Sequence, residues 1–411
     1  MRISTVTMFE QSTASMNRQQ SDLMKVSQQI ASGRRVVNPS DDPQAASRAV
    51  GVDQAKAVTE QYSDARVSAR NSLSQTESIL NSVSDAVTSA KTLLIQASSD
   101  TLSDVDREAI ASELKGVYET MLGQANATDG NGRYLFGGYK DNAPPFVKSA
   151  DGSVQYQGDS NVREQRVDAS RLMPVNDNGE TIFKSVPSGA GYVAEAKKEN
   201  GDLNDGNVTF SGPQISDVKN ATDFRITFTS DVAFDIETFD GTDWNAVKSE
   251  SYTWESGDPA QQVSYGGVSI SLEGTPVTDD SILVAKAGSE QREPDLFRTM
   301  EEAIRVLENP ADTSAKKADL RNTLNTAMRD LDNSLDNVLT VRASAGARLN
   351  ELDVIDSVGS NRMLNYDQTL SDLVDLDYTE AISEYSLRQI GMQASQKAFV
   401  DIKGLSLFNY M

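Results

Sequence analysis

Apolar residues recur every seven positions in three separate stretches of the chain. A sustained seven-residue repeat lays a narrow apolar seam along one side of a helix, and such a seam needs partner helices. The pattern therefore predicts a mainly α fold with a long antiparallel helical coiled-coil bundle built from both chain ends. The three series are Leu324, Leu331, Val338, Ala345 and Leu352; Leu73, Leu80, Val87 and Leu94; and Phe9, Met16, Leu23 and Ile30.

Glycine, proline and capping residues mark the breaks between the predicted helices. Gly33 suits the position after a helix end, and Asp42 followed by Pro43 is typical of an N-cap and a first helical position. We interpret the neighbouring carboxylates Asp41 and Asp42 as helix caps rather than as a metal or acid–base site, because carboxylates favour the positive end of a helix. A helix is predicted over residues 43–97.

A second helix is predicted to open at Ser103, where Asp106 completes a capping arrangement. It ends in the glycine-rich run 129–132. That run lacks a following Lys-Ser or Lys-Thr pair and a preceding strand, so its context excludes a phosphate-binding loop and favours a turn.

The middle of the chain alternates polar and apolar residues. Phe224–Phe228 and Val268–Leu272 read as strands, and Asp240-Gly241 lies between two further runs as in a hairpin. We expect a small antiparallel β domain inserted over residues 141–290. Its acidic clusters lack the spacing of a calcium loop, so no metal site and no cofactor is predicted.

Helical spacing returns at Pro294 and, after Asn309-Pro310, continues from about Ala315 to Ser357. Met328, Leu335 and Leu349 are expected to fill the other half of the last seam. Gly359-Ser360-Asn361 is expected to form a joint before the final arm. The predicted segments are an N-terminal arm (1–42), two bundle halves (43–140 and 291–360) on either side of the insertion (141–290), and a C-terminal arm (361–411).

Each arm carries one thin apolar stripe, which a lone helix cannot bury. We expect the stripes of the two arms to pack against each other and against neighbouring subunits, and the arms of a free monomer to be disordered. The predicted assembly residues are the N-terminal series given above and, in the C-terminal arm, Leu387, Ile390, Ala394, Ala398, Ile402, Leu405, Leu407 and Phe408.

The amino-acid composition disfavours or excludes several classes of function. The 411 residues carry a formal net charge of −23 and an isoelectric point near 4.4, which disfavours nucleic-acid binding. Cysteine and histidine are both absent, so thiol or Ser-His catalysis and the usual zinc sites are excluded, and we expect no enzyme. The first residues lack the apolar core of a secretory signal, and no apolar run has the length needed for membrane insertion.

Several motifs occur in the same order as in a known family. The chain resembles the bacterial flagellin superfamily, and Asn-Pro-Ser-Asp-Asp-Pro favours its junction members over flagellin itself. At the N-terminal side the matching runs are 1–5, 28–35 and 38–43; at the C-terminal side they are 346–350, 371–381 and 392–395, with the final Leu-Ser-Leu.

The resemblance implies a structural subunit of the hook–filament junction, needed for motility. It implies export by the flagellar type III apparatus, an export chaperone, self-association into a ring, hook-associated protein 1 on one side and flagellin on the other. A flagellin-like filament subunit is the alternative. An enzyme or binding module in the β domain would have to work with carboxylates, and no pair in 141–290 has the spacing for one.

Overall fold

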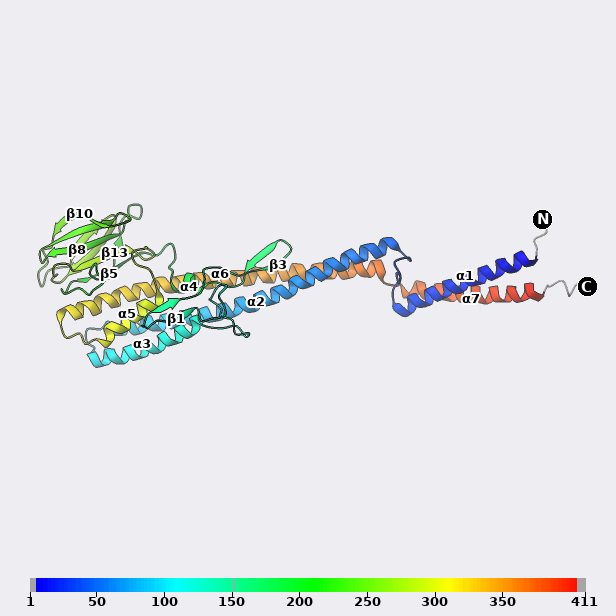
Figure 1. The fold of residues 1–411 in the computed structure, drawn as a ribbon, viewed down its shortest axis with the longest axis horizontal. Coiled ribbons are helices and arrows are strands. Elements are labelled where there is room, and N and C mark those ends of the chain that lie inside the picture. Colours follow the sequence, from blue (N-terminus) through cyan, green and yellow to red (C-terminus); the bar gives the residue numbers. More distant parts are fainter. Residues whose placement is uncertain (1–4, 151, 405–411) are drawn as a thin grey trace, which may run out of the picture. The chain divides into compact units, whose positions relative to one another are not determined.

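The computed structural model describes residues 5–150 and 152–404, and it divides into two compact units. One unit comprises residues 1–65 and 353–411, and the other comprises residues 66–352. Long helices come from both chain ends and antiparallel strands come from the middle of the chain (Figure 1). The predicted fold class is confirmed.

The helices account for the two ends of the chain and the strands for residues 146–286. The helices are α1 (Thr5–Ser32), α2 (Pro43–Ala97), α3 (Asp104–Ala125), α4 (Gly179–Phe183), α5 (Leu296–Glu308), α6 (Ser314–Val374) and α7 (Tyr378–Gly404). The strands are β1 (Phe146–Lys148), β2 (Val154–Tyr156), β3 (Glu164–Asp168), β4 (Arg171–Pro174), β5 (Tyr192–Ala196), β6 (Thr209–Phe210), β7 (Gln214–Ile215), β8 (Phe224–Ser230), β9 (Ala233–Phe239), β10 (Trp244–Ser251), β11 (Gln261–Tyr265), β12 (Val268–Glu273) and β13 (Ser281–Lys286).

Side chains cap the helices where the sequence predicted caps. The Ala45 N–H donates to Asp42 Oδ1 at 3.0 Å at the start of α2. At the start of α3, Ser103 and Asp106 form a reciprocal capping box. Each cap satisfies backbone N–H groups that the helix itself leaves unpaired.

Within residues 66–352, α2 and α6 pack antiparallel along a complete 4–3 repeat. The ion pairs Lys91–Asp332 (2.5 Å) and Glu77–Arg342 (2.9 Å) flank this seam and fix the antiparallel order. All nine residues of the two seven-residue series that the sequence assigned to the bundle are buried. They are Leu73, Leu80, Val87, Leu94, Leu324, Leu331, Val338, Ala345 and Leu352.

The second half of the α6 seam differs from the prediction. The buried positions are Ala327, Ser334, Val341 and Arg348. Three of them lie one residue before the predicted Met328, Leu335 and Leu349, which are only partly buried, and Val341 replaces no predicted residue. Positions three and four residues beyond a seam residue flank it on the same helix face. In the pairs Ala327/Met328 and Ser334/Leu335, hydrophobicity favours burial of the larger second residue. The direction from which the partner helix approaches buries the first residue instead.

The predicted joint at residues 359–361 was wrong. α6 continues through Gly359 to Val374, and the Lys56–Asp367 ion pair (2.7 Å) holds it to α2 beyond this point. A single glycine inside a helix costs about 1 kcal/mol, which continued packing offsets. The helix ends instead at Val374, and residues 375–377 separate it from α7.

The predicted insertion contains two structurally different parts. Phe146 on β1 and Phe183 on α4 lie 5.1 and 5.7 Å from the ring of Phe297 on α5, and β1, β2 and α4 share the core of the helical bundle. Residues 192–286 form a β sandwich with a core of its own. The β domain is therefore shorter than the predicted range 141–290.

The β domain consists of two antiparallel sheets. One sheet has the order β10-β9-β8-β13-β5, and the other has the order β11-β12-β6, with β7 also paired to β12. The predicted hairpin is confirmed, since Phe239 pairs with Trp244 across a turn that contains Gly241 with φ +104°. Figure 1 shows β5 and β13 near α6.

We predict that Leu331→Ala destabilises the helical bundle by about 2–5 kcal/mol, because it leaves a cavity in the seam. Urea unfolding followed by circular dichroism at 222 nm measures the change. Leu364→Ala is the matched control on the same helix, because Leu364 is 66% exposed. The control should change stability by less than about 0.5 kcal/mol. Equal effects of the two substitutions would contradict the seam.

Candidate assembly interface

The two terminal helices α1 and α7 lie side by side and run antiparallel (Figure 1). The rings of Phe9 and Phe399 are 5.1 Å apart. The Ser395 hydroxyl donates to Gln19 Oε1 at 2.6 Å, and Arg388 pairs with Asp22 at 2.8 Å. The helices that the sequence assigned to the assembly arms therefore contact each other through polar as well as apolar side chains.

The contact face of α1 contains the predicted stripe. Met16, Leu23 and Ile30 are half-buried, whereas Phe9 is 45% exposed. The sequence prediction missed Val26, the best-buried of these side chains at 3% exposure. Val26 lies three residues after Leu23 and four before Ile30, so a search for the full 4–3 pattern would have found it.

The contact face of α7 is not the predicted one. Side chains that face α1 lie on the series Ala381, Tyr385, Arg388, Met392, Ser395 and Phe399. This series alternates steps of four and three residues, as a helix seam requires. The expected intrachain pairing of Leu387, Ile390 and Ala398 with α1 was wrong. The observed series includes the polar residues Arg388 and Ser395. A search for apolar residues passes over them, so the sequence prediction missed this seam.

The predicted residues of α7 form the opposite face of the helix. Leu387 is 71% exposed and Ile390 is 63% exposed, and Ala394 and Ala398 are also exposed. The side chain of Ile402 is not described, and Leu405, Leu407 and Phe408 lie outside the described residues. Within the described residues, α7 thus presents an apolar outer face that its own chain does not cover.

Charge separates α1 and α7 from the rest of the chain. α1 carries two acidic and two basic side chains, and α7 carries three of each. The net charge of −23 therefore comes entirely from residues outside these two helices. Copies of the α1–α7 pair can approach one another without the repulsion that the remaining surface creates.

A backbone clasp joins the two helix breaks at residues 33–42 and 375–377. The Arg35 N–H donates to the Val374 carbonyl at 2.7 Å, and the Leu376 N–H donates to the Gly33 carbonyl at 3.0 Å. Gly33 has φ +70°, and a Cβ atom there would lie 3.0 Å from the hydroxyl of Tyr378. This position requires glycine for both backbone conformation and space.

The cap carboxylates reinforce the clasp. Asp41 pairs with Lys25 at 3.0 Å and Asp42 pairs with Arg35 at 3.1 Å. Hydrogen bonds from the backbone, that of Asn38 above all, lower the pKa of Asp41, and the backbone N–H of Ala45 and then Arg35 lower the pKa of Asp42. Both carboxylates therefore stay ionised to lower pH than free aspartate.

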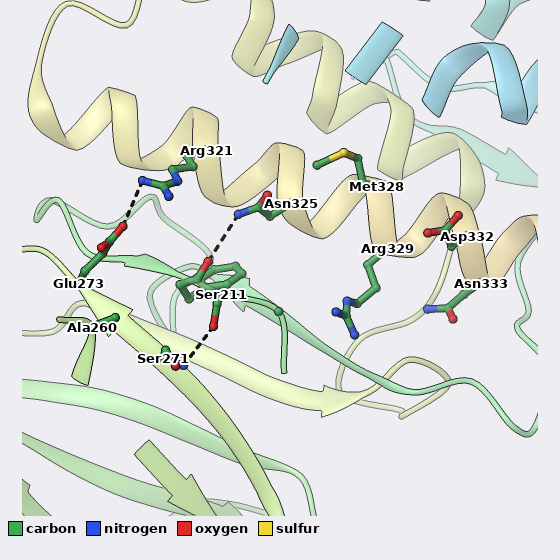
Figure 2. Close-up of a pocket in the computed structure, with 12 residues that line it drawn as sticks. Ser211, Ala260, Ser271, Glu273, Arg321, Asn325, Met328, Arg329, Asp332 and Asn333 are labelled. Atoms are coloured by element: carbon green, nitrogen blue, oxygen red, sulfur yellow. Dashed lines mark hydrogen bonds and ion pairs between the residues drawn. The ribbon is translucent and has the colours of Figure 1, made fainter. Parts of the chain in front are cut away.

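A second candidate site is a groove of about 710 Å³ between the β domain and α6 (Figure 2). Arg321 spans it to Glu273 at 3.1 Å, and Asn325 reaches the Phe210 carbonyl at 3.4 Å. Met328 and Arg329 also line it. The lining mixes both charges with apolar groups and brings together no nucleophile and base.

Metal and membrane sites are not found in the described part of the chain. In residues 5–150 and 152–404, no group of three or more acidic side chains converges in a way that could hold an ion. Over the same residues, no helix has both the length and the apolar character needed to cross a bilayer. The candidate interaction surface in the described residues is therefore the apolar outer face of α7.

Comparison with known proteins agrees with this emphasis. A family model of the bacterial flagellin N-terminal helical region matches residues 3–141. Flagellar hook-associated protein 3 of Escherichia coli (strain K12) is 34% identical over 409 residues, and the match covers 99% of each chain. The chain belongs to the hook-associated protein 3 family. The Salmonella typhimurium member is 32% identical with the same coverage.

A solved structure extends the likeness to three dimensions. The crystal structure of Xanthomonas campestris FlgL (space group C2) has a TM-score of 0.65 and 27% identity. The match covers 78% of this chain and 99% of that one. Full-length membership in the hook-associated protein 3 family makes this chain a structural flagellar protein with a junction role.

We predict that Gly33→Ala weakens the clasp by about 1–2 kcal/mol, because an L-residue resists the left-handed backbone conformation. Amide hydrogen exchange should show faster exchange at Arg35 and Leu376. Gly51→Ala is the control, since a Cβ atom at Gly51 in α2 would meet nothing within 4 Å. Alanine favours the helix there, so exchange should stay equal or slow down. Unchanged exchange in Gly33→Ala would contradict the clasp.

Proposed function

We propose that this chain connects the hook to the filament by self-association of its α1–α7 pair into a ring. The observation that carries the proposal is the apolar outer face of α7, which includes Leu387 and Ile390. Exposed apolar faces of this kind are typical of protein interfaces. The balanced charge of α1 and α7 allows copies to pack closely, whereas the acidic remainder of the chain favours separation.

Burial supplies the driving force for such a ring. Covering one large apolar side chain contributes about 1.5–3 kcal/mol, and the outer face of α7 offers Leu387, Ile390, Ile382 and Val400, each more than half exposed. On the inner face of the pair only Val26 and Ala381 are fully buried among the described apolar residues, and the others are half-buried or exposed. The isolated pair is therefore expected to be marginally stable and to become rigid when neighbouring subunits cover it, in line with the predicted disorder of the free arms.

The partners proposed for the ring are other flagellar components. One face would meet hook-associated protein 1 and the other would meet flagellin. An export chaperone would protect the C-terminal arm before assembly. The route would be the flagellar type III apparatus, without a cleaved signal peptide, to an extracellular position at the hook–filament junction. The family membership and the absence of cysteine cross-links support this route.

We predict that Leu387→Ser with Ile390→Ser prevents incorporation into the junction while leaving the monomer folded. Both side chains are more than half exposed, so their replacement removes apolar surface that is available for assembly and leaves the buried residues of the intrachain seam in place. Swimming of a strain that lacks the protein, complemented with each variant, measures function. Sedimentation and circular dichroism of the purified variant measure its fold.

Val232→Ser is the control, because Val232 is 60% exposed in a turn of the β domain. It should support normal swimming.

Deletion of residues 387–411 should abolish incorporation and leave the β domain folded. Normal filaments built on the double serine variant would refute the assembly role of this face. Counting copies per flagellum distinguishes a junction, which uses few copies, from a filament, which uses very many.

A further inference from the structure

One face of α6 contacts the edges of both sheets of the β domain. Thr326 Oγ1 donates to the Ala194 carbonyl on β5 at 2.6 Å. Asn322 Nδ2 donates to the Val208 carbonyl at 2.8 Å, and Asn322 Oδ1 accepts the Phe210 N–H at 3.2 Å. Asn322 thus pairs with β6 as a neighbouring strand would.

The opposite edge of the larger sheet is protected in another way. Lys248 and Glu250 on β10 form an ion pair, and they lie opposite the buried residues Ile236 and Phe234 of β9. A register shift between Ala246 and Lys248 further disturbs this edge. Charges on the inner side and bulges are devices that prevent a strand edge from pairing with another chain. The β5 edge has no such device and relies on α6.

A buried ion network fastens β5 to α5 and α6. Arg292, immediately before α5, has a side chain only 2% exposed and binds both oxygens of Asp330 on α6 at 2.9 and 2.8 Å. Its Nε lies 3.7 Å from Glu195 on β5. Lys197 joins Glu195 (3.0 Å) to Glu302 on α5 (2.6 Å).

Apolar packing does not unite the β domain with the bundle. The sandwich core includes Phe224, Phe228, Phe234 and Ile270, and it forms a cluster distinct from the bundle core. Val193 is buried on the outer side of β5, but it belongs to neither cluster. The grooves of about 710 and 1070 Å³ beside α6 leave the contact unsealed. Figure 2 shows the first of these, with Arg321 and Asn325 reaching across it.

We propose that α5 and α6 hold the β domain by a polar latch, defined as Arg292, Glu195, Asp330 and the edge-capping residues Asn322 and Thr326. The latch opens without unfolding either part, so that the sandwich changes its position on the bundle as a rigid body. Hydrogen bonds and ion pairs can be exchanged for water at small net cost, whereas each apolar core stays intact. Polar contacts of this kind are typical of domains that move relative to one another.

Acid should open the latch. Burial disfavours ionised Glu195, but Lys197 and then Arg292 outweigh burial and lower its pKa below the ordinary 4.5. Ionised Glu195 therefore stabilises docking above that pH, and its contribution is lost as pH falls through the lowered pKa. The charged groups that face it are Lys197, the residue after its strand, Arg292, Arg298 and Glu302 in and before α5, and Asp330 of α6.

The test uses distances in the full chain, which has no natural cysteine. Spin labels at Thr242→Cys in the β9–β10 turn and Lys316→Cys in α6 report the position of the β domain by pulsed dipolar spectroscopy. Trp254 lines the groove of about 1070 Å³ beside α6, so it is replaced by Phe in every variant. Trp244 then remains the single tryptophan, and because Arg225 of the β domain lies 4.8 Å from its ring, its fluorescence reports the folding of the β domain separately. The unsubstituted latch should give one narrow distance distribution at neutral pH.

Arg292→Gln should increase the undocked fraction by more than about tenfold, because removal of one partner leaves buried carboxylates uncompensated. Thr326→Val, which removes only one edge bond, should give a smaller increase. Arg321→Gln is the matched control, since Arg321 also reaches the β domain from α6 but is 59% exposed. It should leave the distribution unchanged.

Three results decide the proposal. A broad second distance population with unchanged tryptophan fluorescence in Arg292→Gln supports it. A single unchanged distance in Arg292→Gln and Thr326→Val overturns the latch. Loss of the native tryptophan signal together with the change in distance overturns independent folding of the sandwich. None of these readouts depends on incorporation into a flagellum.

Discussion

The antiparallel seam between α2 and α6 is the contact on which the other parts of the structure depend. Its 4–3 repeat aligns residues from the two ends of the chain, and the remaining faces of α6 then become platforms. Arg348 occupies a buried seam position and its guanidinium binds Asp177 at 2.6 Å, and Asn322 and Thr326 donate hydrogen bonds to the sheet edges. The single helix α6 thereby contacts the bundle core, the segment around Asp177 that precedes α4, and the β domain.

The α1–α7 pair repeats the same geometry with a different outcome. Its seam contains polar contacts, Arg388 with Asp22 and Ser395 with Gln19, and few large buried side chains. Meanwhile the outer face of α7 keeps Leu387 and Ile390 exposed. The pair holds its register by specific polar contacts and leaves apolar surface uncovered. This division suits the proposed self-association of the α1–α7 pair.

The β domain shows how an inserted sandwich is accommodated by a helical protein. A sheet edge exposes unpaired backbone groups and invites pairing with other chains. Here α6 covers the edges of β5 and β6, while Lys248 and Glu250 protect β10. The helix substitutes for a neighbouring strand through Asn322, whose amide both donates and accepts. The resulting attachment is specific in geometry, yet it shares no apolar core with the bundle.

The sequence alone determined the helices of both ends, the caps at Asp42 and Ser103, the hairpin at Asp240-Gly241 and the nine buried residues of the two seven-residue series. These features depend on local periodicity and on chemistry within a few residues. Tertiary structure decided that Ala327 rather than Met328 enters the seam, that α6 continues past Gly359, and which face of α7 meets α1. Tertiary structure also placed Phe146 and Phe183 in the core of the bundle instead of the β domain. Each of these features depends on a partner surface that is distant in the sequence. An apolar pattern shows which residues favour burial, but it does not show which part of the protein covers them.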